Sequence, residues 1–229
     1  MGDHAERQAC SGRVEEAGTS TRRRMASLHD CDQVLETLSM SRLRDYLRQQ
    51  VLPRVGIDFY LPTEDRRILE KVIFPYLLAR SDLNRILFVG CEIYTRGYRR
   101  LFRERDYQTI DVNPEHRKYG GRKHITGSFE RIGQHYGPAT LDVVVCNGVC
   151  GWGLDERHSV DAAIAGTFSA LRPGGLFVLG WNDTPQHRPF DFRTSPSLTL
   201  FSAFCFPPLD SAEYLTATSS RHTYNFFEK

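Results

Sequence analysis

The stretch RILFVGCEIYTRGYRRLF, Arg85–Phe102, decides the fold because an apolar run ends in a glycine and a helical pattern follows. The apolar run is Ile86–Val89, and the glycine is Gly90. Nucleotide-binding α/β proteins carry a glycine-rich turn at this place, between a buried strand and a helix. Here Glu92 and Tyr94 stand where further glycines are usual. The stretch predicts a nucleotide-type strand and turn, with a binding loop of a different shape.

Short apolar runs alternate with helical patterns after this turn. Runs without polar alternation are typical of parallel strands that are buried on both faces. Alternating strands and helices of this size predict an α/β fold: a doubly wound, mostly parallel, seven-stranded sheet with N-terminal helices. The predicted strands are Ile86–Val89, Tyr107–Asp111, Lys123–Thr126, Leu141–Asn147, Gly175–Trp181, Leu198–Phe206 and His222–Lys229, with a helix from about Asp155 to Leu171.

The N-terminal third has a different composition. Residues 1–26 are small, polar and charged and predict a disordered leader, whereas residues 27–80 predict a helical extension packed on the core domain, residues 81–229. Within the extension, one helix is expected over residues 27–52. A second begins after Thr63, a candidate N-cap, and Pro75 is expected to kink or break it.

Composition limits the classes of function. The 229 residues carry 30 basic and 28 acidic side chains, a formal net charge of +2, which gives no argument for a nucleic-acid partner. No apolar run approaches the roughly 20 residues of a membrane span, and no secretory signal precedes the domain, so we expect a cytoplasmic protein.

The six cysteines form no C-x-x-C pair and predict free thiols. No carboxylate cluster follows the fourth strand, so we expect no metal.

Asp111 ends the second predicted strand, 21 residues after Gly90. A carboxylate at this spacing binds the ribose diol in dinucleotide-binding folds. The alternative is an aspartate that starts the turn before Asn113 and Pro114.

Glu92 places a negative charge where a pyrophosphate would lie, which disfavours NAD or FAD. S-adenosylmethionine (SAM), which has adenosine but no phosphate, would tolerate this charge.

Five segments resemble class I SAM-dependent methyltransferases in order and spacing: ILFVGC, YQTIDVNPE, HITGSFE, LDVVVCNGV and ALRPGGLFVLGW. The resemblance covers roughly residues 80–229, and the family usually has an acid where Phe88 stands. It implies a SAM site formed by Gly90, Cys91, Asp111, Val112, Gly127, Ser128, Phe129, Asn147 and Gly148. From their chemistry, Glu92 is a candidate partner of the SAM ammonium and Arg96 of its carboxylate. The alternative is that these two pair with each other across one helical turn.

The acceptor side is expected in two loops that follow the fourth and fifth strands. Trp152, Trp181 and Asn182 are candidate substrate contacts, with roles in the core or in turns as the alternatives. A general base is optional for methyl transfer to a good nucleophile. If there is one, the candidates are His158, His187 and Asp183.

Together these features predict a SAM-dependent methyltransferase that transfers methyl to an oxygen, nitrogen or carbon nucleophile of a small molecule. Two alternatives remain: a non-catalytic SAM-binding or scaffold protein of the same fold, and an NAD-dependent oxidoreductase. The sequence leaves the acceptor and the oligomeric state open.

Overall fold

The computed structural model describes residue 58 and residues 60–229. The predicted leader and the first predicted helix, residues 27–52, lie outside the described residues.

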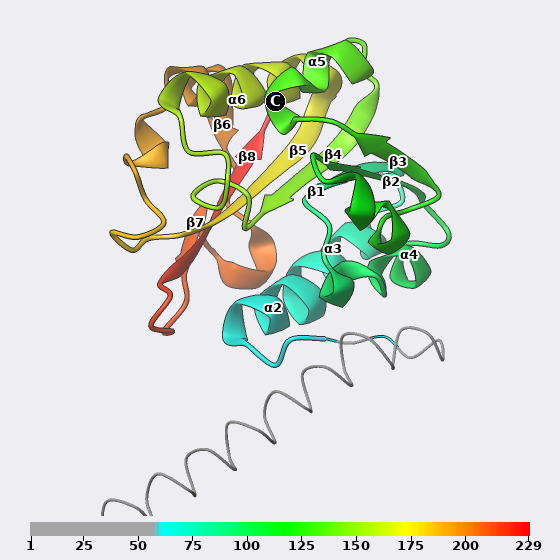
Figure 1. The fold of residues 1–229 in the computed structure, drawn as a ribbon, viewed down its shortest axis with the longest axis horizontal. Coiled ribbons are helices and arrows are strands. Elements are labelled where there is room, and N and C mark those ends of the chain that lie inside the picture. Colours follow the sequence, from blue (N-terminus) through cyan, green and yellow to red (C-terminus); the bar gives the residue numbers. More distant parts are fainter. Residues whose placement is uncertain (1–57, 59) are drawn as a thin grey trace, which may run out of the picture. The chain divides into compact units, whose positions relative to one another are not determined.

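A central sheet organises the described part of the chain (Figure 1). Its strand order is β3-β2-β1-β4-β5-β8-β6, and a short strand, β7, also pairs with β8. Strands β1 to β5 are parallel, whereas β8 is antiparallel to β5, β6 and β7. The strands are β1 Arg85–Val89, β2 Asp106–Asp111, β3 Lys123–Thr126, β4 Leu141–Asn147, β5 Leu171–Asn182, β6 Ser202–Ala203, β7 Glu213–Leu215 and β8 His222–Glu228. This confirms the predicted α/β class and the mostly parallel sheet.

Helices cover both faces of this sheet, as Figure 1 shows with α5 and α6 on one side and α2 and α3 on the other. Every residue of β4 is buried, as its unbroken run of apolar side chains predicts. One core cluster packs β4 residues such as Val144 against α6, and the other packs Val143 against α3. The helices are α2 Glu64–Ile68, α3 Phe74–Ala79, α4 Tyr98–Leu101, α5 Ile132–His135 and α6 Arg157–Ala170.

The second N-terminal helix begins after Thr63, as predicted, but Pro75 does not break it. A π-helical segment, Leu69–Ile73, joins α2 to α3, and Pro75 is the second residue of α3. Proline lacks the N–H that an α-helix needs at that position, and the change from π to α geometry next to it accommodates the missing donor.

The predicted strand Leu198–Phe206 is mostly wrong. A 3₁₀ helix occupies Pro196–Leu200, and only Ser202–Ala203 pairs with β8. Proline is favoured in the first turn of a helix, and this local preference outweighs the apolar run. The other 3₁₀ helices are Ile93–Thr95, Pro114–Tyr119, Phe129–Arg131, Phe192–Thr194 and Pro207–Leu209.

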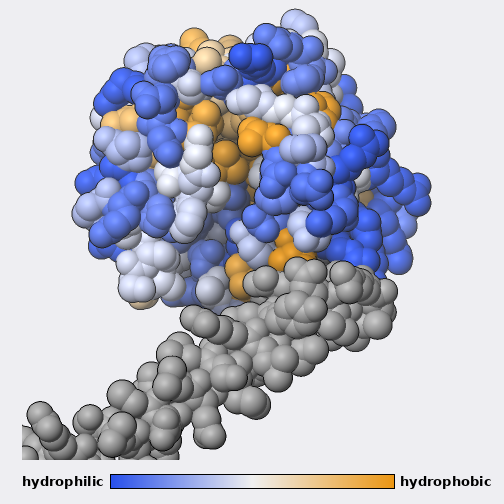
Figure 2. All heavy atoms as spheres, viewed as in Figure 1, coloured by the Kyte–Doolittle hydropathy of each residue, from blue (hydrophilic) through white to orange (hydrophobic). Residues whose placement is uncertain are grey.

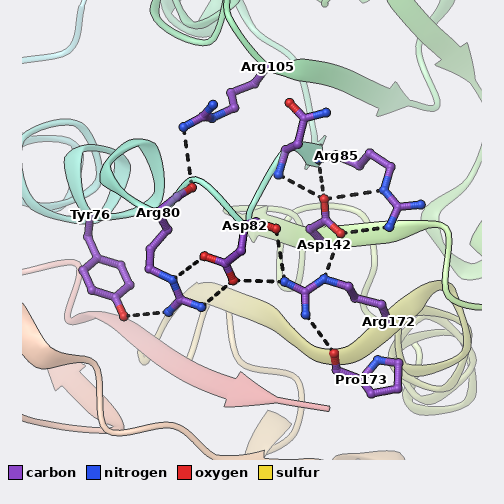
Figure 3. Close-up of polar contacts among 9 residues, drawn as sticks. Tyr76, Arg80, Asp82, Arg85, Arg105, Asp142, Arg172 and Pro173 are labelled. Atoms are coloured by element: carbon purple, nitrogen blue, oxygen red, sulfur yellow. Dashed lines mark hydrogen bonds and ion pairs between the residues drawn. The ribbon is translucent and has the colours of Figure 1, made fainter.

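A polar network joins three strands where they begin (Figure 3). Asp142 of β4 accepts hydrogen bonds from the backbone N–H groups of Asn84 and Arg85, at 3.0 and 2.7 Å. Its other oxygen lies 2.9 Å from Arg85 Nη2 and 3.0 Å from Arg172 Nε of β5. The network fixes the strand starts at the edge of the sheet opposite the carboxyl ends.

The surface view of the same face is mainly hydrophilic, with patches of hydrophobic side chains between charged regions (Figure 2). Among the described residues, no helix is long and apolar enough to cross a membrane.

Candidate cofactor and substrate site

The carboxyl ends of the parallel strands meet at one edge of the sheet, where open α/β sheets bind their ligands. Strand β1 lies between β2 and β4, so strand order reverses beside it. The loops after β1, β2 and β4 therefore form the candidate site.

Gly90 makes the sharp turn after β1. Its φ of +83° is left-handed, and a Cβ there would lie 2.7 Å from Cγ2 of Val149 in the loop after β4. Any other residue would be strained and would collide with that loop. The turn then enters the helix Ile93–Thr95, where the Thr95 hydroxyl accepts a hydrogen bond from the Glu92 N–H at 3.0 Å.

Asp111 connects the ends of β1 and β2. Its Oδ2 accepts a hydrogen bond from the Cys91 N–H at 2.6 Å, and its Oδ1 accepts one from the Asn113 N–H at 2.8 Å. The bond to Asn113 is the turn-forming role that the sequence left open, and the bond to Cys91 fixes the β1 turn. A carboxylate has about four acceptor positions, so both roles leave capacity for ribose hydroxyls.

His116 lies between the two carboxylates of this region and is absent from the sequence-based candidates. Its Nδ1 is 3.2 Å from Asp111 Oδ1, and its Nε2 is 3.6 Å from Glu92 Oε1. The Glu92 carboxylate therefore faces His116. No sequence pattern signals this contact, because His116 reaches Asp111 only through the helix Pro114–Tyr119.

The loops after β2 and β3 hold four of the predicted SAM-site residues, Val112, Gly127, Ser128 and Phe129. Val112 is 66% exposed, which leaves its apolar surface free to pack on a ring. The Gly127 N–H donates to the carbonyl of Asp111 at 2.9 Å, which joins the two loops. Phe129 is buried in a core cluster, whereas Ser128 next to it is partly exposed.

The ends of β4, β5 and β8 are joined through one buried histidine. His222 Nδ1 lies 2.6 Å from Asn182 Oδ1, and its Nε2 lies 2.9 Å from Asn147 Oδ1. Burial lowers the pKa of His222 to about 4, so the ring is neutral near pH 7 and carries a single N–H. One of the two amides must therefore present its NH₂ to the ring. Asn147 Nδ2 is buried without a hydrogen-bond partner among the described residues.

Arg66 of α2 brings a buried cation to the same end of the sheet. The residue is 7% exposed, and its guanidinium carbon lies 4.5 Å from the centre of the Tyr94 ring. A Cβ on Gly148, directly after β4, would lie 3.9 Å from Arg66 Nη2. The sequence-based candidates omit Arg66 because it precedes the first cofactor strand by almost twenty residues.

Trp152 and His187 form a stacked pair at the acceptor loops. Their ring centres are 3.9 Å apart with an interplanar angle of 12°, and Trp152 is 57% exposed. His187 Nδ1 lies 3.1 Å from the carbonyl oxygen of Gly151. The role of Trp152 as a substrate contact and that of His187 as a base both stay predictions.

The remaining acceptor-side candidates are placed less favourably. Trp181 is fully buried and donates to Asn225 Oδ1 at 2.9 Å, which argues against a substrate contact. Asp183 lies 3.0 Å from Arg188, and further arginines approach its other oxygen, so its carboxylate is already engaged. His158 is exposed in the first turn of α6.

The described cysteines and the possible metal ligands were the remaining candidates for chemistry. Burial, together with the charge of Asp111, raises the pKa of the Cys91 thiol to about 12, so it stays protonated. Cys146 and Cys150 are also buried, and Cys205 is an exposed free thiol. No group of three or more metal-ligating side chains comes together in the part of the chain that the structure describes.

Solved structures similar to this chain include SAM-dependent methyltransferases. A SAM-dependent methyltransferase from Archaeoglobus fulgidus has a TM-score of 0.51 and 12% identity, covering 71% of this chain and 94% of that one. A TehB-like SAM-dependent methyltransferase from Corynebacterium glutamicum has a TM-score of 0.51 and 16% identity, covering 86% and 99%. The N-methyltransferase NodS from Bradyrhizobium japonicum has a TM-score of 0.50 and 16% identity, covering 72% of this chain and 98% of that one.

The fold is that of the class I SAM-dependent methyltransferases. No family model and no curated protein matches the sequence.

Within this methyltransferase fold, the predicted residues Gly90, Cys91 and Asp111 are brought into direct contact or close neighbourhood. Arg96 lies just after the Ile93–Thr95 helix, and its pairing with a cofactor carboxylate stays a prediction. The structure adds three side chains that no motif signalled: Arg66, His116 and His222. Arg66 and His222 belong to elements outside the methyltransferase cofactor motifs and reach the site through tertiary packing, whereas His116 follows the YQTIDVNPE motif directly.

Proposed function

We propose that this protein binds SAM and transfers its methyl group to an oxygen, nitrogen or carbon nucleophile of a small molecule. The observation that carries the proposal is the link between the β1 turn and the β2 carboxylate, where the Cys91 N–H donates to Asp111 at 2.6 Å. This link holds a carboxylate with spare acceptor capacity at the switch point of the sheet, where an adenosine ribose binds.

Glu92 supports SAM over a dinucleotide. Its carboxylate and that of Asp111 both lie near His116, so a pyrophosphate at this turn would meet two negative charges. SAM carries an ammonium and a sulfonium group and no phosphate, and the same field favours it. An NAD-dependent oxidoreductase is therefore the weaker candidate.

The chemistry this site supports is alignment. In-line displacement at the SAM methyl needs a nucleophile held close to it and shielded from water. The exposed, stacked Trp152–His187 pair provides a flat wall for an acceptor. Asp183 is engaged by arginines and His158 is exposed, so an acceptor that needs no strong base fits best.

A non-catalytic SAM-binding protein is the second candidate. The observation that favours it is the same scarcity of a base, together with a turn that has lost two of the usual glycines. Binding without turnover across a panel of small nucleophiles would support this second function.

The test is calorimetric titration of the protein with SAM, S-adenosylhomocysteine and NAD. We expect micromolar binding of the first two and none of NAD. Asp111→Asn keeps the size and removes the charge, and we expect it to weaken S-adenosylhomocysteine binding by about 1–3 kcal/mol.

Asp106→Asn is the matched control, because Asp106 is on the same strand at the opposite edge and pairs with Lys123 at 2.8 Å. Equal affinity in wild type and a folded Asp111→Asn protein would remove Asp111 from the site. Binding of NAD alone would overturn the proposed function.

A further inference from the structure

Arg66 is a buried cation that makes no hydrogen bond to a carboxylate among the described residues. Its Nε lies 3.8 Å from Asp65 Oδ2, too far for a hydrogen bond. Its Nη1 reaches the Tyr98 hydroxyl at 3.5 Å, the outer limit of such a bond. Glu70 is engaged by the Tyr98 hydroxyl at 2.7 Å rather than by the guanidinium. An arginine is always charged, and a buried charge without a hydrogen-bonded partner is costly.

The free side of the guanidinium points to the ligand-binding edge. Arg66 Nη2 would lie 3.9 Å from a Cβ on Gly148, and Gly148 has no side chain to come between them. The Tyr94 ring covers one face of the guanidinium, which fixes the plane of its donors.

A second donor without an acceptor lies at the same strand end. Asn147 is 4% exposed, and when its Oδ1 accepts the N–H of His222, its Nδ2 has no partner among the described residues. Buried donors are almost always satisfied in proteins. With the Asn147 amide in this orientation, two donors at the end of β4 lack a close acceptor, and a ligand would supply one.

We propose that Arg66 binds a ligand carboxylate at the end of β4. A planar guanidinium matches the two oxygens of a carboxylate better than any other anion-binding side chain. The inference rests on the proposed function in taking the ligand from the methyl-transfer reaction. The carboxylate belongs either to the methionine part of SAM, which is the group that the sequence assigned to Arg96, or to the acceptor.

The first arm of the test uses two ligands that differ only in this group. S-adenosylhomocysteine and its decarboxylated analogue, which keeps the amine, are titrated into wild type, Arg66→Met and Arg66→Lys. If the carboxylate is that of SAM, wild type prefers S-adenosylhomocysteine by about 10- to 100-fold. Arg66→Met abolishes the preference, and Arg66→Lys, which keeps the charge without the fork, retains part of it.

The second arm uses benzoate as the probe, on free protein and on protein saturated with S-adenosylhomocysteine. If the carboxylate belongs to the acceptor, wild type binds the two nucleosides with equal affinity and also binds benzoate. Arg66→Met then does not bind benzoate. Arg67→Met is the matched control because Arg67 is the exposed neighbour on the same helix, and it should behave as wild type in both arms.

Circular dichroism and thermal melting establish that each variant is folded. The proposal is overturned if wild type and Arg66→Met show the same discrimination between the nucleosides and the same response to benzoate. Failure of every adenosine ligand to bind wild type would contradict the proposed function, and the benzoate arm would still decide whether Arg66 binds a carboxylate.

Discussion

Gly180, near the end of β5, shows how tightly side chains pack beside the candidate site. A Cβ there would lie 2.0 Å from Asn147 Oδ1 and 2.9 Å from His222 Nε2. We expect Gly180→Ala to displace the Asn147 amide, break its contact with His222 and lower the free energy of unfolding by about 1–3 kcal/mol. Urea unfolding measures this change. Gly133→Ala is the control, because a Cβ on Gly133 in α5 meets nothing within 4 Å. An unchanged stability for Gly180→Ala would mean that the Asn147 amide does not hold this position.

At the same scale, Glu92 shows what a single residue can and cannot predict. Its charge and its place in the turn were enough to disfavour a pyrophosphate from the sequence alone. Its partner was not predictable, because the 3.6 Å approach of His116 depends on how the loop after β2 folds back over the β1 turn.

At the scale of elements, Asp142 holds three strands in register (Figure 3). Its side chain is 6% exposed and accepts from two backbone N–H groups and two guanidinium groups. Asp142→Ala leaves those donors without an acceptor, so we expect a loss of about 2–4 kcal/mol in the free energy of unfolding. Because Asp142 lies at the edge opposite the candidate site, ligand affinity of the folded variant should be unchanged.

Asp82→Ala is the matched control in the same network. Its side chain is 47% exposed and pairs with Arg80 and Arg172, so its removal should cost less than about 1 kcal/mol. Equal losses for the two variants in urea unfolding would contradict a special role of Asp142.

Elements differed in how well the sequence predicted them. Strand β4 was predicted to the residue because its side chains are apolar on both faces, and β8 was predicted to within one residue. Helical periodicity predicted α6 with small errors at its ends. The segment Leu198–Phe206 was misjudged because Leu198 packs from a 3₁₀ helix against the cluster that contains α6, whereas Phe206 belongs to the other core cluster. The candidate site was predictable where it lies in strand-end motifs and was missed where a distant element reaches it, as with Arg66.

At the scale of the whole molecule, His222 couples folding to pH. Burial lowers the pKa of His222 to about 4, whereas a histidine in the unfolded chain titrates near 6.5. Between these values the unfolded chain holds more protons than the folded one, so the folded state loses stability as the pH falls from 6.5 to 4. The expected loss from this group alone is about 3 kcal/mol, fully present only at the acid end of the window.

Urea unfolding of wild type and His222→Gln at pH 7, 6, 5 and 4 isolates this contribution, because the other titrating groups are common to both proteins. The variant should be less stable at pH 7, since Gln fits the amide contacts of Asn147 and Asn182 less well than the ring does. The difference in stability between the two proteins should shrink steadily below pH 6.5. The reason is that the unfolded wild-type chain then binds a proton at His222 that the folded chain does not bind, whereas the glutamine of His222→Gln does not titrate. A difference that stays constant down to pH 4 would show that His222 titrates normally, and that the three strand ends are held together by a ring that water reaches.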